Sequence, residues 1–277
     1  MSEVLCEGVI KVYKTGKIEV VALRGLNLRV GKGELRAIVG PSGSGKSTFI
    51  FLARGLHKQF GGEIKGKIVI YGKDMDELDF EELTRLGIGW VGQNPLFNLH
   101  QLTVYDEILS SPIYFGLPWE ECERIAKGIM KQLKIEELKD RAPTQLSGGQ
   151  MQKVAIAAAL VMAEIGKKKE GLLLLDEPSS FLDPVGKEEL VNFLKKLKKE
   201  LTMVIVTHDI QTFLPITDKI ILLSNGKKIK EGDKSLVNHQ MLDKVVGAPL
   251  NTKLKLDKSF RKWVTNFKKE KEFKEYV

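Results

Sequence analysis

The segment from Gly40 to Thr48 constrains the fold of this chain more than any other. It reads Gly-Pro-Ser-Gly-Ser-Gly-Lys-Ser-Thr and fits the pattern G-x-x-x-x-G-K-[ST] in full. The apolar stretch from Leu35 to Val39 precedes it, and the stretch from Lys46 to Leu56 follows with apolar residues on one side, as in a helix. A buried strand that runs into a glycine-rich turn and then into a helix predicts a phosphate-binding loop within an α/β fold.

Each residue type in this phosphate-binding loop has a physical task. Glycines let the backbone turn so that its N–H groups point at an anion, and the helix that begins at Lys46 adds the positive end of its dipole. We expect Lys46 to reach the terminal phosphates of a nucleotide and the Ser47 hydroxyl to ligate Mg²⁺. An ordinary flexible Gly/Ser turn is the alternative, which the flanking strand and helix disfavour. The predicted nucleotide-binding residues are Gly40, Pro41, Ser42, Gly43, Ser44, Gly45, Lys46, Ser47 and Thr48.

The composition of the 277 residues is that of a globular chain. Apolar residues make up 43% and charged residues 29%, which excludes a disordered chain, a collagen-like fibre and a small disulfide scaffold. The formal net charge of +8 permits an anionic partner without identifying one. Cys6 and Cys122 lie too far apart to form a metal-spaced pair, as suits a reducing cytosol. We expect no membrane span, because the longest apolar run, residues 154–163, is about half of the ~20 residues that a span needs.

Changes in pattern along the chain indicate an α/β core with a helical insertion. Up to about residue 95 the sequence reads as short strands broken by glycines, and from Val104 to Ala163 it reads as helices. From Gly171 onward strands and helices alternate, which predicts right-handed crossovers and a parallel sheet. The expected strands outside the phosphate-binding unit are at 68–71, 88–91, 172–175, 203–206 and 220–223, and a helix is expected at 186–201.

Three of the predicted strands end in residues that suit phosphate chemistry. In open α/β sheets, ligands bind outside the carboxyl ends of the strands. The phosphate-binding loop follows one strand, Asp176 and Glu177 follow the strand at 172–175, and His208 follows the strand at 203–206. Asp176 suits a Mg²⁺ site reached through water, and Glu177 suits a base for an attacking water. The alternatives are a helix N-cap for the two acids and a structural role for His208.

The segment from Leu146 to Gln150 predicts the start of a helix. Ser147 as the N-cap and Gln150 three residues later form a capping-box pattern. Gly148 and Gly149 in the first turn cost roughly 1 kcal/mol each relative to alanine. An anion that approaches the helix end would explain why bare backbone is needed there.

Taken together, these motifs resemble those of the ATP-binding-cassette (ABC) ATPases. The phosphate-binding loop is similar to Walker A, residues 172–176 with Glu177 are similar to Walker B and its glutamate, and Leu146–Gln150, the signature segment, is similar to the family signature. The resemblance runs in family order from about Tyr13 to Gly232. It adds an adenine-stacking residue, Tyr13, the Q-loop glutamine Gln93, the D-loop Ser180–Asp183 and the switch histidine His208.

This resemblance implies a mechanism in which two cassettes pair head to tail. ATP and Mg²⁺ held by one chain are then capped by Ser147, Gly148, Gly149 and Gln150 of the other, with Asp183 among the binding residues. ATP favours the closed pair, and hydrolysis releases it. The implied catalytic residues are Glu177 as base, His208 on the γ-phosphate, Gln93 and Lys46, and the implied metal ligands are Ser47, Gln93 and Asp176.

The resemblance also implies a fold class and a division of the chain. The expected fold is α/β, a P-loop NTPase core with a mainly parallel sheet, an N-terminal antiparallel β region and a helical insertion subdomain. The expected parts are the N-terminal core at 1–95, the helical subdomain at 96–165, the C-terminal core at 166–235 and a basic extension at 236–277. Phe260, Trp263 and Phe267 in that extension recur at helical spacing. They indicate a helix packed on protein, a membrane-surface helix or a solvated tail.

Two partners are implied, a second ABC ATPase subunit, identical or not, and an integral membrane transporter subunit; no nucleic acid is expected. Membrane contact is expected to be peripheral, at the cytoplasmic face of the cell membrane, through the second of these partners. The docking groove is expected between about Gln93 and Gly116, where apolar side chains either contact the partner or pack inside the insertion. These side chains are Leu96, Phe97, Leu99, Leu102 and Tyr114.

A finer resemblance points to the ATPase subunits of energy-coupling factor importers for vitamins and for cobalt or nickel. Residues 62–67, 93–95, 103–108 and 154–160 carry it, and peptide and amino-acid importer ATPases share parts of it. Asn98, Phe181 and Lys153 depart from the usual glutamine, small residue and arginine. The alternatives are an exporter or peptide-importer ATPase and a soluble ABC protein acting on DNA, ribosomes or cofactor assembly. A non-hydrolysing regulatory cassette is disfavoured, because the base and the signature segment are intact.

Overall fold

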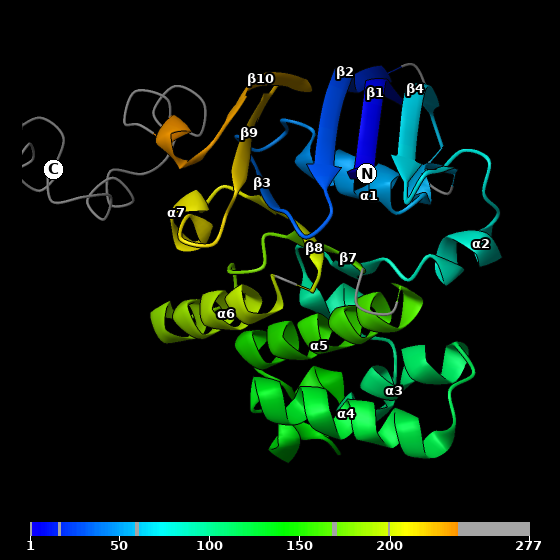
Figure 1. The fold of residues 1–277 in the computed structure, drawn as a ribbon, viewed down its shortest axis with the longest axis vertical. Helices are drawn as coiled ribbons and strands as arrows, with labels where there is room; N and C mark the ends of the chain where they lie inside the picture. Colours follow the sequence, from blue (N-terminus) through cyan, green and yellow to red (C-terminus); the bar gives the residue numbers. More distant parts are fainter. Residues whose placement is uncertain (1, 16–17, 59–60, 168–170, 199, 238–277) are drawn as a thin grey trace, which may run out of the picture.

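Two β-sheets organise the fold. The computed structural model describes residues 2–15, 18–58, 61–167, 171–198 and 200–237 (Figure 1). The smaller sheet is antiparallel with strand order β2-β1-β4-β5, and the larger has the order β10-β9-β3-β8-β7-β6. Neighbours in the larger sheet are parallel from β9 to β6, whereas β10 pairs antiparallel with β9. The strands are β1 (Ser2–Thr15), β2 (Ile18–Gly31), β3 (Leu35–Val39), β4 (Glu63–Ile70), β5 (Lys73–Asp74), β6 (Gly89–Val91), β7 (Leu172–Asp176), β8 (Thr202–Thr207), β9 (Lys219–Ser224) and β10 (Lys227–Gly232).

The helices lie in separate groups at different ends of the molecule. Figure 1 shows α1 beside the smaller sheet at one end of the molecule and the group α3, α4 and α5 at the other end. The predicted α/β class, mainly parallel sheet and N-terminal antiparallel region are therefore confirmed. The α-helices are α1 (Lys46–Ala53), α2 (Phe80–Arg85), α3 (Val104–Tyr114), α4 (Trp119–Leu133), α5 (Gly148–Lys167), α6 (Pro184–Leu197) and α7 (Ile210–Phe213), and the short 3-10 turns are η1 (Leu56–Lys58), η2 (Pro95–Asn98), η3 (Glu136–Leu138), η4 (Pro143–Gln145) and η5 (Lys234–Leu236).

The two faces of the larger sheet bury different partners. In β7, Leu173 and Leu175 belong to the apolar cluster that includes residues of α3, α4, α5 and α6. Leu172 and Leu174, which alternate with them along the strand, belong to the cluster that includes α1, β1, β2 and β4. A strand buried on both faces reads as a continuous apolar run, and this explains why the leucines at 172–175 predict it so clearly.

The prediction of short strands in the first 95 residues is wrong for β1 and β2, whereas β3 to β6 are between two and eight residues long. β1 and β2 are each 14 residues long and form a hairpin. Gly8 and Gly25 have φ of 59° and 81°, and the register shifts between Cys6 and Val9. A glycine in the left-handed region can form a bulge that bends a strand while its pairing continues on both sides. These glycines therefore mark bulges, where the sequence pattern indicated strand ends.

Several predicted boundaries also differ from the structure. α1 ends at Ala53 instead of Leu56, because Gly55 follows with φ of 71° and stops the helix. α6 begins at Pro184 instead of Gly186, because the Asp183 side chain accepts a hydrogen bond from the Gly186 amide and caps it. The predicted helix near Phe260 to Phe267 lies outside the described residues. Within the described residues, none of the helices combines the length and apolar character that a membrane crossing requires.

Candidate nucleotide-binding site

The phosphate-binding loop lies where β3 passes into α1, at the carboxyl edge of the larger sheet. Its glycines allow other strands to approach closely. A Cβ at Gly40 would lie 2.1 Å from the Leu223 carbonyl oxygen of β9, and a Cβ at Gly45 would lie 2.6 Å from the Ala22 carbonyl oxygen of β2. Gly45 also has φ of 98°. Larger residues would therefore displace the loop from the strands that position it.

Lys46 is held inside this loop. Its side chain is 9% exposed, and Nζ donates hydrogen bonds to the carbonyl oxygens of Gly40 at 2.9 Å and Pro41 at 3.0 Å. Burial lowers the pKa of the Lys46 ammonium, and the nearby carboxylates of Glu177 and Asp176 act in the opposite direction. The ammonium is thus partly removed from water, at a position where an anion would be strongly attracted.

The loop also carries a buried hydroxyl that fits an additional acceptor. Ser44 is 2% exposed, and among the described residues its Oγ has no hydrogen-bond partner. A buried hydroxyl without a partner is costly, and a phosphate oxygen would satisfy it. The backbone of Ser44 is fixed on both sides, since its N–H donates to the Pro41 carbonyl oxygen and its own carbonyl oxygen accepts from the Gly226 amide. These features fit a phosphate group bound in the loop.

Two oxygen donors that suit Mg²⁺ lie beside the loop. The Ser47 hydroxyl hydrogen-bonds to the Asp176 carboxylate, which joins the start of α1 to the end of β7. Burial raises the pKa of Asp176 to about 6, and the neighbouring Glu177 carboxylate adds to this rise, whereas Ser47 and Lys46 lower it. A cation bound here would attract the buried Asp176 carboxylate and offset the free energy that its burial costs. Within the described chain no group of three or more His, Cys, Asp and Glu side chains gathers for a metal, so phosphate and water would complete such a Mg²⁺ site.

Glu177 is anchored to the end of β8. Its carboxylate is 6% exposed and accepts hydrogen bonds from the Thr207 hydroxyl and the His208 amide, both at 3.0 Å. The His208 ring lies against the same carboxylate, with Nδ1 2.9 Å from Oε1. Glu177 also has φ of 52°, an uncommon backbone conformation for a non-glycine residue. Glu177 is one residue beyond Asp176, and so the predicted base and the predicted metal ligand lie at the same strand end.

Sequence reasoning missed Thr207 as a functional candidate. Thr207 is completely buried, and its hydroxyl both donates to Glu177 and accepts a 2.9 Å hydrogen bond from the Asp209 amide. A hydroxyl residue that closes an apolar strand directly before His208 is the signal that could have found it. Thr207 orients the carboxylate that we expect to activate water.

Gln93 lies just beyond β6, and Tyr13 lies on β1. Gln93 is exposed and lies two residues beyond Val91 of β6, which pairs with Leu175 of β7, so it reaches the same carboxyl edge as Asp176. Asn98 closes the turn after it, since its Oδ1 accepts a 2.9 Å hydrogen bond from the Gly92 amide. Tyr13 lies near the end of β1, partly exposed. The roles of Gln93 and Tyr13 toward a nucleotide stay predictions.

The signature segment is built separately from the phosphate-binding loop. The capping box forms, with the Ser147 amide donating to Gln150 Oε1 at 3.0 Å and the Gln150 amide donating to Ser147 Oγ at 3.3 Å. Gly148 packs against the D-loop, because a Cβ there would lie 3.1 Å from Phe181 Cδ1. None of the hydrogen bonds found in the described residues joins the signature segment or Asp183 to the phosphate-binding loop.

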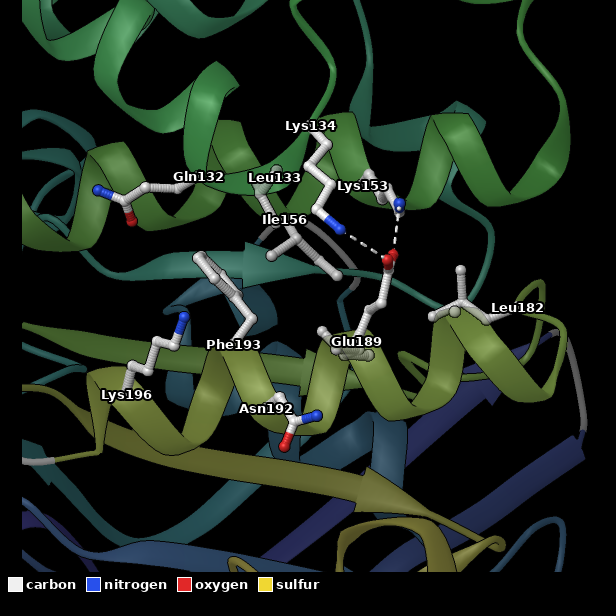
Figure 2. Close-up of a pocket in the computed structure, with 12 residues that line it drawn as sticks. Gln132, Leu133, Lys134, Lys153, Ile156, Leu182, Glu189, Asn192, Phe193 and Lys196 are labelled. Carbon is white, nitrogen blue, oxygen red and sulfur yellow. Dashed lines mark hydrogen bonds and ion pairs between the residues drawn. The ribbon is translucent and has the colours of Figure 1, made fainter.

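A separate cavity of about 250 Å³ lies between α5 and α6 (Figure 2). Glu189 of α6 crosses its rim and forms ion pairs with Lys153 of α5 at 3.0 Å and with Lys134, which follows α4, at 3.1 Å. Lys153 is the residue that stands in place of the usual arginine. The cavity is distinct from the nucleotide site, and its ion pairs link the predicted helical subdomain to the core.

Comparison with known proteins decides the family. Residues 23–180 match the ABC transporter family. A putative ABC transporter ATP-binding protein of Pyrococcus abyssi is 36% identical over 256 residues, covering 90% of this chain and 88% of that protein. The chain belongs to the ABC transporter family. It is an ABC ATPase and its nucleotide is ATP, as the resemblance predicted.

Further relatives of this ABC ATPase cover most of its length. The energy-coupling factor transporter ATP-binding protein EcfA of Methanocaldococcus jannaschii is 37% identical over 213 residues, covering 76% of this chain and 72% of EcfA. The cassette MJ0796, solved as a dimer bound to ADP and Pi, superposes with a TM-score of 0.72 at 33% identity over 83% of this chain and 98% of its own. CbiO1 of Clostridium perfringens, part of the transporter complex CbiONQ, superposes with a TM-score of 0.71 at 30% identity over 87% of this chain and 92% of its own.

Proposed function

We propose that this ABC ATPase is the motor subunit of an importer of the energy-coupling factor type. In this proposal it binds MgATP between two cassettes paired head to tail and works through a separate integral membrane subunit at the cytoplasmic face of the membrane. One observation carries the proposal. Lys46, the Ser47–Asp176 pair and the anchored Glu177 share one sheet edge, whereas the intact signature segment of the same chain is capped without any described hydrogen bond to them.

Each residue at the sheet edge has a defined task in hydrolysis. Lys46 exchanges its two carbonyl acceptors for phosphate oxygens and stabilises the negative charge that the transition state spreads over them. Ser47 and Asp176 would hold Mg²⁺, which when bound neutralises phosphate charge. Glu177 takes the proton of the attacking water, and Thr207 keeps its carboxylate in place. General-base assistance of this kind contributes ~10²–10⁴-fold.

The second cassette supplies the opposite side of the ATP. Ser147 is exposed, and its helix start, with two small residues in the first turn, can approach a γ-phosphate held by another chain. Phe181 and Val185 are 45% and 66% exposed, which leaves apolar surface beside the signature segment for that chain. MJ0796, solved as a dimer with ADP and Pi, is a precedent for this pairing.

Exposed apolar side chains on η2, on α3 and in the segment between them support docking to a membrane subunit. Phe97 is 73% exposed, Leu102 is 84% exposed and Tyr114 is 53% exposed, and Leu96 is 37% exposed. Leu99 is 7% exposed and packs in the core, so for this residue the alternative of packing inside the protein holds. These four residues lie in one segment of the chain, 96–114, and exposed apolar side chains that gather on a surface mark an interaction site. The names of EcfA and CbiO1 support the subtype, since both belong to transporter complexes.

Glu177→Gln tests the pairing and the catalytic base together. The amide can still accept from Thr207 but cannot take a proton, so we expect ATP binding to persist, turnover to fall by ~10²–10⁴-fold and the ATP-bound protein to become dimeric. Light scattering after size-exclusion chromatography measures the mass with and without MgATP. Glu188→Gln, at an exposed glutamate of α6, is the matched control and stays as wild type. A strictly monomeric ATP-bound Glu177→Gln protein would contradict the proposal.

Isolation from native membranes tests the membrane partner. We expect the wild-type chain to co-purify with a protein that has several membrane spans. The double substitution Phe97→Ser and Leu102→Ser removes two of the most exposed apolar groups and should reduce this co-purification while ATP hydrolysis persists. The control is Phe80→Ser, which removes a group that is 71% exposed on α2, outside the predicted groove. A wild-type chain that is consistently isolated alone would favour the soluble, non-transport alternative.

A further inference from the structure

A buried lysine lies against the predicted adenine-stacking residue. Lys11 is 1% exposed, two residues before Tyr13 on β1, and its Nζ is 5.0 Å from the centroid of the Tyr13 ring. Lysine is among the residues least often buried, because its ammonium loses hydration. A buried lysine at this position therefore needs partners for its charge.

The surroundings of Lys11 fix its ammonium in place. Nζ donates a hydrogen bond to the carbonyl oxygen of Gly61. The backbone at Gly62 closes in on β1, where a Cβ would lie 2.2 Å from the Val12 carbonyl oxygen. Burial lowers the pKa of Lys11, and the carboxylate of Asp76 opposes this and favours the charged form. Asp76 is itself fixed by a 2.7 Å contact with His57 Nε2.

We propose that Lys11 is a positioning residue that acts through Tyr13 to strengthen the stacking of adenine. This inference rests on the proposed placement of adenine on Tyr13. A cation above one face of an aromatic ring is attracted to its π-electrons and holds the ring in one orientation. It also draws electron density towards itself, so the opposite face repels the electron-rich adenine less. A ring that is fixed before ATP arrives loses less conformational freedom on binding.

The proposal predicts that substitution of Lys11 weakens only the part of the binding affinity that comes from the adenine base. Lys11→Met removes the charge and retains a long, unbranched side chain. We expect the affinity for ATP to fall about three- to tenfold and the affinity for inorganic tripolyphosphate, which has no base, to stay unchanged. Isothermal titration calorimetry in Mg²⁺ measures both probes. If the role of Lys11 is purely structural, the substitution should instead weaken the binding of both ATP and tripolyphosphate, or of neither.

Matched variants make the measurement specific. Lys14→Met removes the same charge three residues further along β1, where the ammonium pairs with Glu19 and Glu63 at the surface, and should leave both affinities unchanged. Lys11→Arg keeps a cation and should retain most of the preference for ATP. Lys11→Gln is a second neutral variant that can still donate to Gly61, and it replaces Lys11→Met if thermal unfolding shows that variant to be unfolded.

A double substitution identifies the route of the effect. In a Tyr13→Ala background, Lys11→Met should cause no further loss of ATP affinity, because the ring through which it acts is gone. An additional loss in that background, an unchanged ATP affinity in Lys11→Met, or an equal loss for tripolyphosphate would each overturn the inference. If Tyr13→Ala alone leaves ATP affinity unchanged, the placement of adenine on Tyr13 fails as well. If it weakens ATP binding while Lys11→Met does not, the role of Lys11 alone is rejected.

Discussion

The phosphate-binding loop and the signature segment both present glycines at the start of a helix, but they are built in opposite ways. In the loop, Lys46 and Ser44 are buried, and strands β2 and β9 approach the backbone so closely that side chains at Gly40 and Gly45 are excluded. In the signature segment, Ser147 is exposed and the capping box is formed by its own residues. The conformation of the loop is determined by contacts with distant parts of its own chain. The signature segment is capped by its own residues and is exposed.

This difference shows which glycines are required by contacts within the chain and which are not. Gly40 and Gly45 of the loop are explained by contacts inside the chain, and Gly43 by its φ of 74°. Gly149 has no such explanation, because a Cβ there would meet its nearest atom, the Phe181 carbonyl oxygen, at an ordinary contact distance of 3.4 Å. Helix propensity disfavours glycine at that position by roughly 1 kcal/mol. The missing reason is supplied by our proposal that the phosphates of ATP bound to a second cassette approach this helix end.

The largest expected effect separates the two segments directly. Lys46→Ala removes a charge-assisted contact to phosphate and should weaken ATP binding to the isolated chain on the order of 10- to 100-fold. Ser147→Ala should leave that affinity unchanged, cost about 1 kcal/mol of stability through the lost cap, and abolish most of the turnover. Calorimetry, thermal unfolding and phosphate release measure the three quantities. An equal loss of ATP affinity in both variants would show that both segments bind the same ATP in one chain.

Mixing the two variants turns the comparison into a test of geometry. If the chain pairs with itself, random pairing makes roughly half of the dimers mixed, and each mixed dimer contains one intact composite site out of two. We therefore expect turnover to recover to roughly a quarter of the wild-type value when Lys46→Ala and Ser147→Ala proteins, each nearly inactive, are combined. Because the intact site would use the loop of one chain and the signature segment of the other, no recovery at all would contradict pairing between identical chains.

Parts of the fold and of the site that depend on local physics could be predicted from the sequence. The unit from β3 to α1 is one such part, because an apolar strand, a glycine turn and a largely apolar helix follow one another without interruption. The position of Asp176 at the end of β7 is another, because a short apolar run that follows a glycine and ends in two acids is typical of a strand buried on both faces. The capping box at Ser147 depends on two residues three apart and needs no tertiary information.

Features that depend on distant contacts could not be predicted. The clamp of Thr207 on Glu177 joins residues 30 apart, and the sequence does not say which strand will lie beside β7. The contact of Lys11 with Gly61 joins β1 to a turn 50 residues away. For Leu99 the sequence left both contact with a partner and internal packing open, and the fold places it in the core. In each case the sequence offered a plausible residue type, and tertiary packing decided its role.

The smallest expected effect concerns the stability that the chain loses by burying the Asp176 carboxylate, the predicted Mg²⁺ ligand, when no cation is bound. Burial raises the pKa of Asp176 from 3.8 to about 6, so between these two pH values the folded chain binds more protons at this site than the unfolded chain. The contribution of Asp176 to stability is therefore favourable when it is protonated and is lost as the pH rises through about 6. Asp176→Asn keeps an acceptor for Ser47 without the charge. We expect it to raise the free energy of unfolding of the nucleotide-free chain at pH 7.5, on the order of 1–2 kcal/mol, and to give no gain near pH 4.

The same substitution should act in the opposite direction on function, because a neutral amide is a poor ligand for Mg²⁺. Urea unfolding between pH 4 and 7.5 measures the stability, and ATP turnover at rising Mg²⁺ concentration measures the cation requirement. Asp140→Asn, at a carboxylate whose side chain is 84% exposed, is the control and should change neither quantity. An Asp176→Asn chain that is less stable than wild type at pH 7.5 would mean that the carboxylate is stabilised by Lys46 and Ser47 beyond the cost of its burial. The Asp176 carboxylate would then need no cation for its stability. The contrast between the phosphate-binding loop and the outward-facing signature segment would rest on geometry alone.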